Sequence, residues 1–200
     1  MKLPFSWEDW QRWTAEWRSR RDLRALFDFL NGKSVAIVGN ATSLLEHEHG
    51  SLIDEHEIVT RMNMGFPINP VAQGTRFDLW CFSSFRATRL APPGFVAPRS
   101  VWMSPKFREQ TDHGVDCYFY PVSHWRTLHR RFGARPSVGA MTIDLVSHAA
   151  PRQVTIIGFD FNRTKTYYET RELASPHDFA AEGRYVMELV KQRSWRFVAT

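Results

Sequence analysis

Short apolar segments that alternate with helical patterns constrain the fold of this chain most. Six segments of four to six residues have strand character: residues 34–38, 57–61, 77–82, 100–103, 116–120 and 154–157. Residues 137–149 and roughly 176–191 have helical patterning instead. Apolar strands that alternate with helices are typical of a mostly parallel sheet covered on both faces. We therefore predict an α/β fold, a single Rossmann-like domain whose mostly parallel, twisted sheet is flanked by helices.

Composition excludes several classes of protein. With 200 residues and 43% hydrophobic content the chain can bury one core, so disorder throughout is excluded. The 26 basic and 21 acidic residues give a net charge of +5, which favours small anionic ligands such as phosphates and sugar acids. The surplus is too small and too scattered to predict a nucleic-acid surface. Every apolar segment is far shorter than the roughly 20 residues of a membrane span.

Two further sequence features predict a cytoplasmic protein. No apolar segment follows the first methionine, so a secretory signal is not expected. Cys81 and Cys117 are the two cysteines, and free thiols are expected for both in a reducing compartment.

An unusual helix is predicted over residues 6–30. Trp7, Trp10, Trp13 and Trp17 recur at helical spacing, an apolar stripe continues to Leu30, and Asn31-Gly32 supplies a stop. Two interpretations stay open. The helix packs across the domain, or its tryptophans and arginines hold the protein at the inner face of a membrane as a peripheral contact. We divide the chain into this Trp/Arg-rich amphipathic helix, residues 1–32, and a nucleotide-sugar-binding catalytic domain, residues 33–200.

Polar groups follow the first two predicted strands. Gly39 permits a sharp turn and a close approach to a ligand, and Asn40 follows it directly. Asn63 follows the second strand and would lie beside Asn40 if the strands are neighbours, since ligands of parallel sheets sit beyond the carboxyl ends of strands. Neither G-x-G-x-x-G nor a Walker sequence is present. The alternative is that these residues only form turns and helix caps.

Residues 133–141, G-A-R-P-S-V-G-A-M, read as a loop that enters a helix. Pro136 suits the first turn, Ser137 can cap the helix or bind a ligand, and Gly139 allows close approach. Arg135 can add a positive charge. A simple capped helix start is the alternative interpretation.

His177 is the candidate general base. It follows Pro176 near the expected start of a helix, where the charged imidazolium is disfavoured and the neutral ring can take a proton. A structural histidine is the alternative. No H-E-x-x-H pattern is present, and we expect neither a metal nor another cofactor.

Taken in order, these segments resemble glycosyltransferase family 29, the sialyltransferases. Its large motif is matched by V-A-I-V-G-N at 35–40, I-D-E-H-E-I-V-T-R-M-N at 53–63 and G-T-R-F-D at 74–78. Its small motif is matched by P-S-V-G at 136–139, which leads to V-T-I-I-G-F at 154–159. T-Y-Y-E at 166–169 corresponds to the third motif, and His177 with Glu182 to the last. The resemblance covers residues 33 to 185 and implies the sialyltransferase variant of the GT-A fold.

The family transfers a sugar acid from its CMP ester to an acceptor hydroxyl with inversion. The resemblance implies that the donor contacts Asn40 and Asn63 through phosphate and ribose, that the P-S-V-G loop meets the cytidine, that His177 is the catalytic base and that Glu182 supports the site. The expected nucleotide-sugar-binding residues are Gly39, Asn40, Asn63, Arg135, Ser137, Val138, Gly139, Thr166 and Tyr167. The implied partners are a CMP-sugar donor, carrying sialic acid or a related acid such as Kdo, and a glycan or glycolipid acceptor.

The chain departs from the family pattern at two positions, which keeps two alternatives open. Val35 stands where the family has a cysteine, and Thr166 stands where its third motif has a histidine. One alternative is a degenerate nucleotide- or glycan-binding module without transfer activity. The other is a magnesium-dependent diphosphotransferase, because G-N-A-T-S-L is also similar to the phosphate-binding turn of those enzymes.

Overall fold

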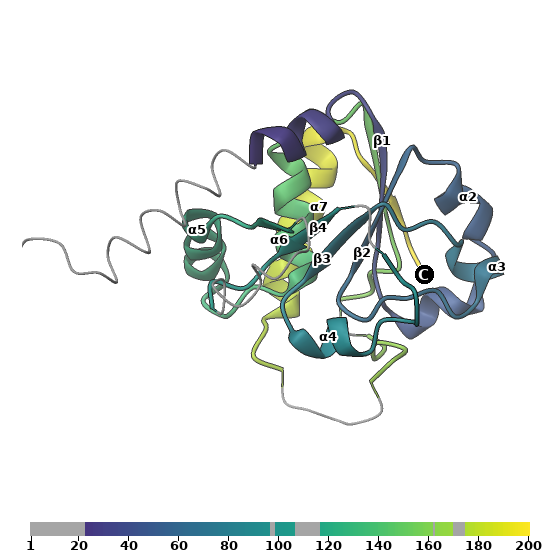
Figure 1. Ribbon diagram of the computed structural model, residues 1–200. Coiled ribbons are helices and arrows are strands. Elements are labelled where there is room, and N and C mark those ends of the chain that lie inside the picture. Colours follow the sequence, from purple (N-terminus) through teal and green to yellow (C-terminus); the bar gives the residue numbers. More distant parts are fainter. Residues whose placement is uncertain (1–22, 97–98, 107–116, 162, 170–174) are drawn as a thin grey trace, which may run out of the picture.

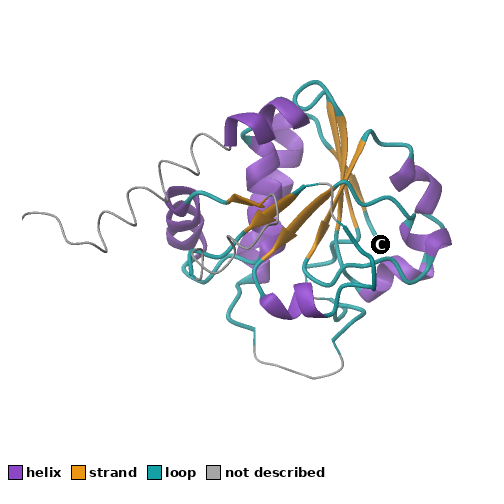
Figure 2. Cartoon of the chain, in the orientation of Figure 1, coloured by secondary structure: helices purple, strands orange, loops and turns teal. Residues whose placement is uncertain are grey.

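The predicted α/β fold is confirmed. A computed structural model describes residues 23–96, 99–106, 117–161, 163–169 and 175–200. These residues form one seven-stranded sheet in the order β5-β4-β3-β2-β1-β6-β7, and all six strand pairs are parallel (Figures 1 and 2). The strands are β1 (Ser34–Val38), β2 (Ile58–Met62), β3 (Leu79–Phe82), β4 (Ser100–Trp102), β5 (Cys117–Phe119), β6 (Gln153–Ile157) and β7 (Arg196–Val198).

Helices lie on both sides of the sheet. The described helices are residues 23–30, the 3₁₀ helix η1 (Thr42–Glu46), α2 (Gly50–Asp54), α3 (Pro70–Gln73), α4 (Phe85–Arg89), α5 (Val122–Phe132), α6 (Val138–Ser147) and α7 (Phe179–Arg193). Residues 23–30, α5, α6 and α7 lie on one side of the sheet, and α2 and α3 lie on the other (Figure 1). This is the two-sided cover that apolar parallel strands require.

Alternate strand residues supply the two faces of the core. Val35 and Ile37 of β1 pack in one apolar cluster with the helix at 23–30, α5, α6 and α7. Ala36 and Val38 point to the other face, where they join residues of η1 and α2. Over β3 and β4 this second face is aromatic, with Trp80 stacked on Phe82 at 4.1 Å between ring centroids. Burial on both faces explains why these strands read as continuous apolar segments.

The described end of the predicted N-terminal helix packs on the domain. Residues 23–30 are helical, and Leu23, Leu26 and Leu30 are buried in the larger core cluster. Gly32 follows in the left-handed region, with φ of 69°, as a helix stop requires. The tryptophan-rich part lies outside the described residues, so its membrane contact stays a prediction. Across the described residues, no helix combines the length and the apolar character that crossing a bilayer demands.

Several elements differ from their predicted bounds or were not predicted. α7 begins at Phe179 rather than near residue 176, and the predicted strands other than β1 differ from their observed bounds by one or two residues. The sequence analysis missed α3, α4, α5 and β7. The signal for α5 was present, because Leu128 and Phe132 repeat at helical spacing and Gly133 ends the helix in the left-handed region. Cys81 and Cys117 are not joined in a disulfide.

Candidate active site

A cavity of about 310 Å³ opens at the carboxyl ends of β1, β2 and β6 and at the first turn of α6. It brings together residues separated by more than 140 positions in the sequence. Of the site residues predicted from sequence, it is lined by Gly39, Asn40, Asn63, Arg135, Ser137, Val138, Gly139, Thr166, His177 and Glu182. The topology explains this convergence, because β1 lies between β2 and β6 in a parallel sheet.

Gly39 is required by packing between backbones at the floor of the cavity. A Cβ atom on Gly39 would lie 2.0 Å from the carbonyl oxygen of Gly158, which follows β6. Gly158 has a φ of 74°, a conformation that side chains other than glycine rarely adopt. The two strand ends therefore approach each other closely enough to leave the neighbouring polar groups exposed to the cavity.

Asn40 and Asn63 are held by neighbouring strands and by Tyr168. The Asn40 Nδ2 atom donates to the Met62 carbonyl at 3.0 Å and to the Tyr168 hydroxyl at 3.3 Å. Asn63 is left-handed with a φ of 48°, and its Oδ1 accepts from the Ser83 backbone N–H at 3.2 Å. Asparagine tolerates this conformation better than most residues. The two amides therefore have fixed orientations.

The first turn of α6 is organised by a buried carboxylate. Glu182 accepts from the Ser137 backbone N–H at 2.7 Å and from its hydroxyl at 2.6 Å. The same hydroxyl caps α6 by accepting from Ala140 at 3.1 Å. Ser137 is thus fully engaged by the protein. Among the described residues, none accepts from the backbone N–H groups of Val138 and Gly139, so these two donors of the helix start are left for a ligand.

Burial and two hydrogen bonds act in opposite directions on Glu182. Burial raises the pKa of this carboxyl, and the hydrogen bonds from Ser137 oppose the shift. Its two oxygens already accept bonds from Ser137. This geometry suits the supporting role that was expected for Glu182.

His177 has the geometry of a neutral base. Its Nδ1 atom lies 2.6 Å from the carbonyl oxygen of Arg135, and a carbonyl can only accept, so Nδ1 carries the proton. In the neutral ring Nε2 is then the atom with a free lone pair. The pKa of His177 is lowered, chiefly because the ring is removed from water and also because the Arg135 charge is close. The sequence analysis credited the helix start instead, but α7 begins two residues later.

The segment after β6 runs beside η1 and closes one side of the cavity. Thr166 forms an antiparallel bridge with Ala41, and Asp160 accepts from the Thr164 backbone N–H at 2.7 Å. Tyr167 does not line the cavity; its hydroxyl donates to the Phe66 carbonyl at 3.1 Å. Tyr167 was expected to bind the nucleotide sugar, and the structure does not bring it to the cavity with the other predicted residues.

Tyr168 occupies the cavity instead of Tyr167. Residues 166–169 form a turn that the Glu169 backbone N–H closes on the Thr166 carbonyl at 3.0 Å, and both Thr166 and Tyr168 line the cavity. Tyr168 was not among the predicted site residues, and its place at the cavity depends on this turn. Burial raises the pKa of Tyr168, while hydrogen bonds with Asn40, Thr166 and Asn63 oppose the shift.

Several residues of the large motif lie away from the cavity and hold the fold. Asp54 accepts from Thr75 and Arg76, and the Arg76 guanidinium donates to Asp78 and to backbone carbonyls. Arg61 is 1% exposed and donates to the carbonyls of Arg76 and Gln73 at 2.8 and 2.6 Å. We call Asp54, Arg61, Arg76 and Asp78 the loop-anchoring network.

Metal-ligating side chains do not gather in the cavity among the described residues. One group of three that could hold an ion lies elsewhere, at His124, Asp144 and His148. The Asp160 carboxylate, which does line the cavity, accepts hydrogen bonds from Thr164 within its own turn. The described side chains at the cavity therefore offer hydrogen-bond donors, one imidazole and two carboxylates that already accept hydrogen bonds, Glu182 from Ser137 and Asp160 from Thr164.

Comparisons with known proteins agree with this architecture. The family model of glycosyltransferase family 29 (sialyltransferase) matches residues 19–71. No protein of curated function matches the sequence. A mammalian sialyltransferase in complex with Gal-beta-1-3GalNAc-ortho-nitrophenol superposes with a TM-score of 0.63 at 15% identity, covering 93% of this chain and 84% of that one. A second mammalian sialyltransferase structure gives 0.63 at 16%, covering 92% and 78%.

A bacterial enzyme shares the fold as well. The sialyltransferase CstII from Campylobacter jejuni, in complex with the substrate analogue CMP-3FNeuAc, gives a TM-score of 0.53 at 14% identity, covering 80% of this chain and 76% of that one. Identities this low show the fold alone, and the family model contributes the sequence pattern. The chain is thus similar to glycosyltransferase family 29 in sequence over residues 19–71 and to the sialyltransferases in fold.

Proposed function

We propose that this protein is an inverting, metal-independent glycosyltransferase that moves sialic acid, or a related keto-sugar acid such as Kdo, from a CMP donor to a glycan hydroxyl. One observation carries the proposal: two oriented amides, the free donors of the α6 start and a neutral imidazole border a single cavity. The similarity to the family supports sialyl transfer as the reaction class.

His177 would act as the general base. Its Nε2 atom takes the proton of the acceptor hydroxyl while the hydroxyl oxygen attacks the anomeric carbon of the donor. The new glycosidic bond forms on the face opposite the breaking bond to the CMP phosphate, so CMP leaves with the bonding electrons and the configuration inverts. The Arg135 carbonyl keeps the ring oriented and stabilises the imidazolium that results.

The donor would be held by dipoles and one cation. The backbone N–H groups of Val138 and Gly139 lie in the first turn of α6, a helix of ten residues. The N-terminus of a helix favours an anion. Asn40 and Asn63 supply neutral polar groups, and Arg135 supplies positive charge at the rim. These groups can bind a nucleotide monophosphate without a divalent ion, and this is the basis for proposing metal independence.

The acceptor would enter beside Asn63. A second hollow of about 220 Å³ shares Asn63, Ser83 and Tyr168 with the main cavity and extends over Arg86 of α4. Its position next to the donor site gives a glycan hydroxyl a route to the reacting carbon. We further propose a cytoplasmic location, where a CMP-sugar and a lipid-linked acceptor can meet at the inner face of a membrane.

The decisive variant is His177→Ala. We expect transfer from a CMP-sugar to fall by about 10²–10⁴-fold, the usual contribution of a general base, while CMP affinity measured by calorimetry stays within a few-fold of the wild type. His129→Gln, at an exposed histidine of α5, is the matched control and should leave both quantities unchanged.

Each alternative function gives its own result in this experiment. Full transfer activity in His177→Ala would refute the base assignment. CMP binding by the wild type without transfer or hydrolysis of any CMP-sugar would favour a binding module. A strict requirement for Mg²⁺ and a preference for AMP over CMP would favour a diphosphotransferase.

A further inference from the structure

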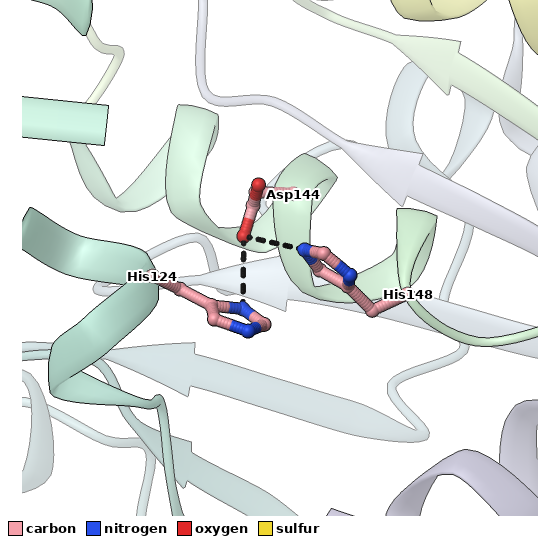
Figure 3. A group of neighbouring side chains, drawn as sticks. All are labelled: His124, Asp144 and His148. Atoms are coloured by element: carbon pink, nitrogen blue, oxygen red, sulfur yellow. Dashed lines mark ion pairs between the residues drawn. The ribbon is translucent and has the colours of Figure 1, made fainter. Parts of the chain in front are cut away.

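A second cluster of histidine and carboxylate groups lies between α5 and α6, away from the cavity. His124 comes from the first turn of α5, while Asp144 and His148 are one turn apart on α6. Figure 3 shows both imidazoles aimed at the same oxygen of Asp144. The His124 Nδ1 atom lies 3.4 Å from that oxygen, and the His148 Nε2 atom lies 3.5 Å from it.

These separations suit metal ligands better than hydrogen bonds. Nitrogen-to-oxygen hydrogen bonds are usually about 2.7–3.2 Å long. Two ligands of a tetrahedral zinc ion, each at about 2.0–2.1 Å, are separated by roughly 3.3 Å. All three candidate ligand atoms already lie within 4.8 Å of one another. The His148 side chain is 45% exposed, so it is free to close the remaining distance.

The buried Nδ1 atom of His124 has the Asp144 carboxylate as its polar neighbour, at 3.4 Å. This nitrogen is inaccessible to solvent and makes no hydrogen bond with any described residue. A buried polar atom in this state carries a desolvation cost that a ligand would remove. The atom faces the Asp144 carboxylate, and a ligand that bridges an imidazole lone pair and a carboxylate is a cation.

The carboxylate is oriented from behind by two tyrosines. The Tyr120 hydroxyl donates to Asp144 Oδ2 at 2.6 Å, and the Tyr185 hydroxyl donates to Oδ1 at 2.7 Å. Outer hydrogen bonds of this kind orient the ligands of metal sites. The carboxylate cannot turn away from the two histidines without breaking one of these bonds.

We propose that His124, Asp144 and His148 form a binding site for a divalent transition metal, with Zn²⁺ as the best fit. Two imidazoles and one carboxylate are ligands that zinc accepts, and the exposed side of His148 leaves a fourth position for water. The ion would join α5 to α6 and stabilise the domain by binding the folded state alone.

This site is separate from the proposed reaction. His148 lies eleven residues after Ser137 along α6, or roughly 16 Å along the helix axis at 1.5 Å per residue. Binding there would change the stability of the fold without supplying a metal to the transfer step. The test therefore measures metal binding and unfolding rather than activity.

The test is zinc calorimetry on the tag-free chain, supported by the visible absorption of Co²⁺ in place of Zn²⁺. We expect one equivalent of zinc to bind and the melting temperature to rise with zinc but not with Mg²⁺. His148→Gln removes one proposed zinc ligand. It should lower zinc affinity by more than roughly 10–100-fold, which is the usual loss when a residue that only hydrogen-bonds a metal ligand is removed. His124→Gln should do the same, and His129→Gln on α5 is the control.

Equal zinc affinity in the wild type and His148→Gln would overturn the proposal, as would the absence of zinc binding by the wild type. Because His148 is exposed, its variant should fold, and circular dichroism of the metal-free protein checks this. CMP binding by His148→Gln should match the wild type. A loss of CMP binding would contradict the separation of the two sites.

Discussion

Two groups of polar residues from the same segment, residues 33–78, lie at opposite ends of the same strands. At the carboxyl ends, Gly39, Asn40 and Asn63 border the cavity. At the amino ends, the loop-anchoring network joins the loops before β2 and β3, and Arg61 reaches the second loop from within β2. The cavity group faces open space, whereas in the network Arg61 and Asp54 bond backbone groups within the fold.

Residues 33–78 therefore contain one group of residues that stabilises the fold and another that borders the cavity. Residues of the network fix the loops that determine where β2 and β3 begin, and residues of the cavity present groups at the other end of those strands. A substitution in the network should therefore lower stability, and a substitution at the cavity should lower activity. The three predictions below test this division, in order of their expected effect on the free energy of unfolding.

The largest effect is expected for Arg61→Met. Arg61 is buried, and its guanidinium donates to the carbonyls of Gln73 and Arg76. Burial lowers its pKa to about 10, so the side chain is still charged at neutral pH. Methionine leaves both carbonyls without this donor, which should lower the free energy of unfolding by about 2–4 kcal/mol in urea titrations.

Arg130→Met on the exposed face of α5 is the matched control, with an expected change within about 0.5 kcal/mol. The folded Arg61 variant should bind CMP as the wild type does. A change below about 1 kcal/mol in Arg61→Met would contradict the structural role of the network.

A smaller effect is expected for Asp54→Asn. Burial would raise the pKa of Asp54, but hydrogen bonds from Arg76 and Thr75 outweigh it and hold the pKa below its ordinary value of 3.8. The carboxylate therefore contributes stability above that pH and loses it as the pH falls through the lowered pKa. At neutral pH the variant should lose about 1–2 kcal/mol of unfolding free energy.

Chemical unfolding at several pH values checks this sign. The stability difference between the wild type and Asp54→Asn should shrink as the pH falls below 3.8, where the wild-type carboxylate becomes protonated. Asp28→Asn, at an exposed position of the helix at 23–30, should show no such convergence. A difference that stays constant with pH would show that the Asp54 charge does not matter.

The sequence predicted the sheet well because its central strands are buried on both faces. β1 and β6 have four or five consecutive apolar or β-branched residues, so their position was clear. α5 was missed because its sequence is mostly polar, and only Leu128 and Phe132 are buried. β7 is a three-residue edge strand, and its pairing with β6 depends on the tertiary fold.

The sequence could predict those site residues that come directly after a strand. Asn40 and Asn63 could be placed together because their strands are neighbours. The engagement of Ser137 by Glu182 joins positions 45 residues apart, and the Tyr120 and Tyr185 bonds to Asp144 span 24 and 41 residues. No local pattern encodes such pairs, so the role of Ser137 and the cluster at Asp144 required the structure.

The smallest effect on stability, and a clear one on activity, is expected for Arg135→Ala. Burial is the main cause of the lowered pKa of His177, and the nearby Arg135 charge lowers it further. The acid limb of kcat/KM should therefore lie below pH 6.5 in the wild type, because only the neutral ring accepts a proton. Alanine removes the guanidinium but keeps the backbone carbonyl that holds Nδ1, so the pKa of His177 should rise and the limb should move to higher pH.

High salt should move the wild-type limb in the same direction by screening the Arg135 charge, while the Arg135→Ala limb should hardly respond. Arg184→Ala, at an exposed position of α7, should leave the wild-type profile unchanged. The unfolding free energy of Arg135→Ala should stay within about 0.5 kcal/mol of the wild type, because Arg135 is exposed. A limb that stays at the wild-type pH would mean that the titrating group does not feel the Arg135 charge, and the base would then have to be sought elsewhere in the cavity.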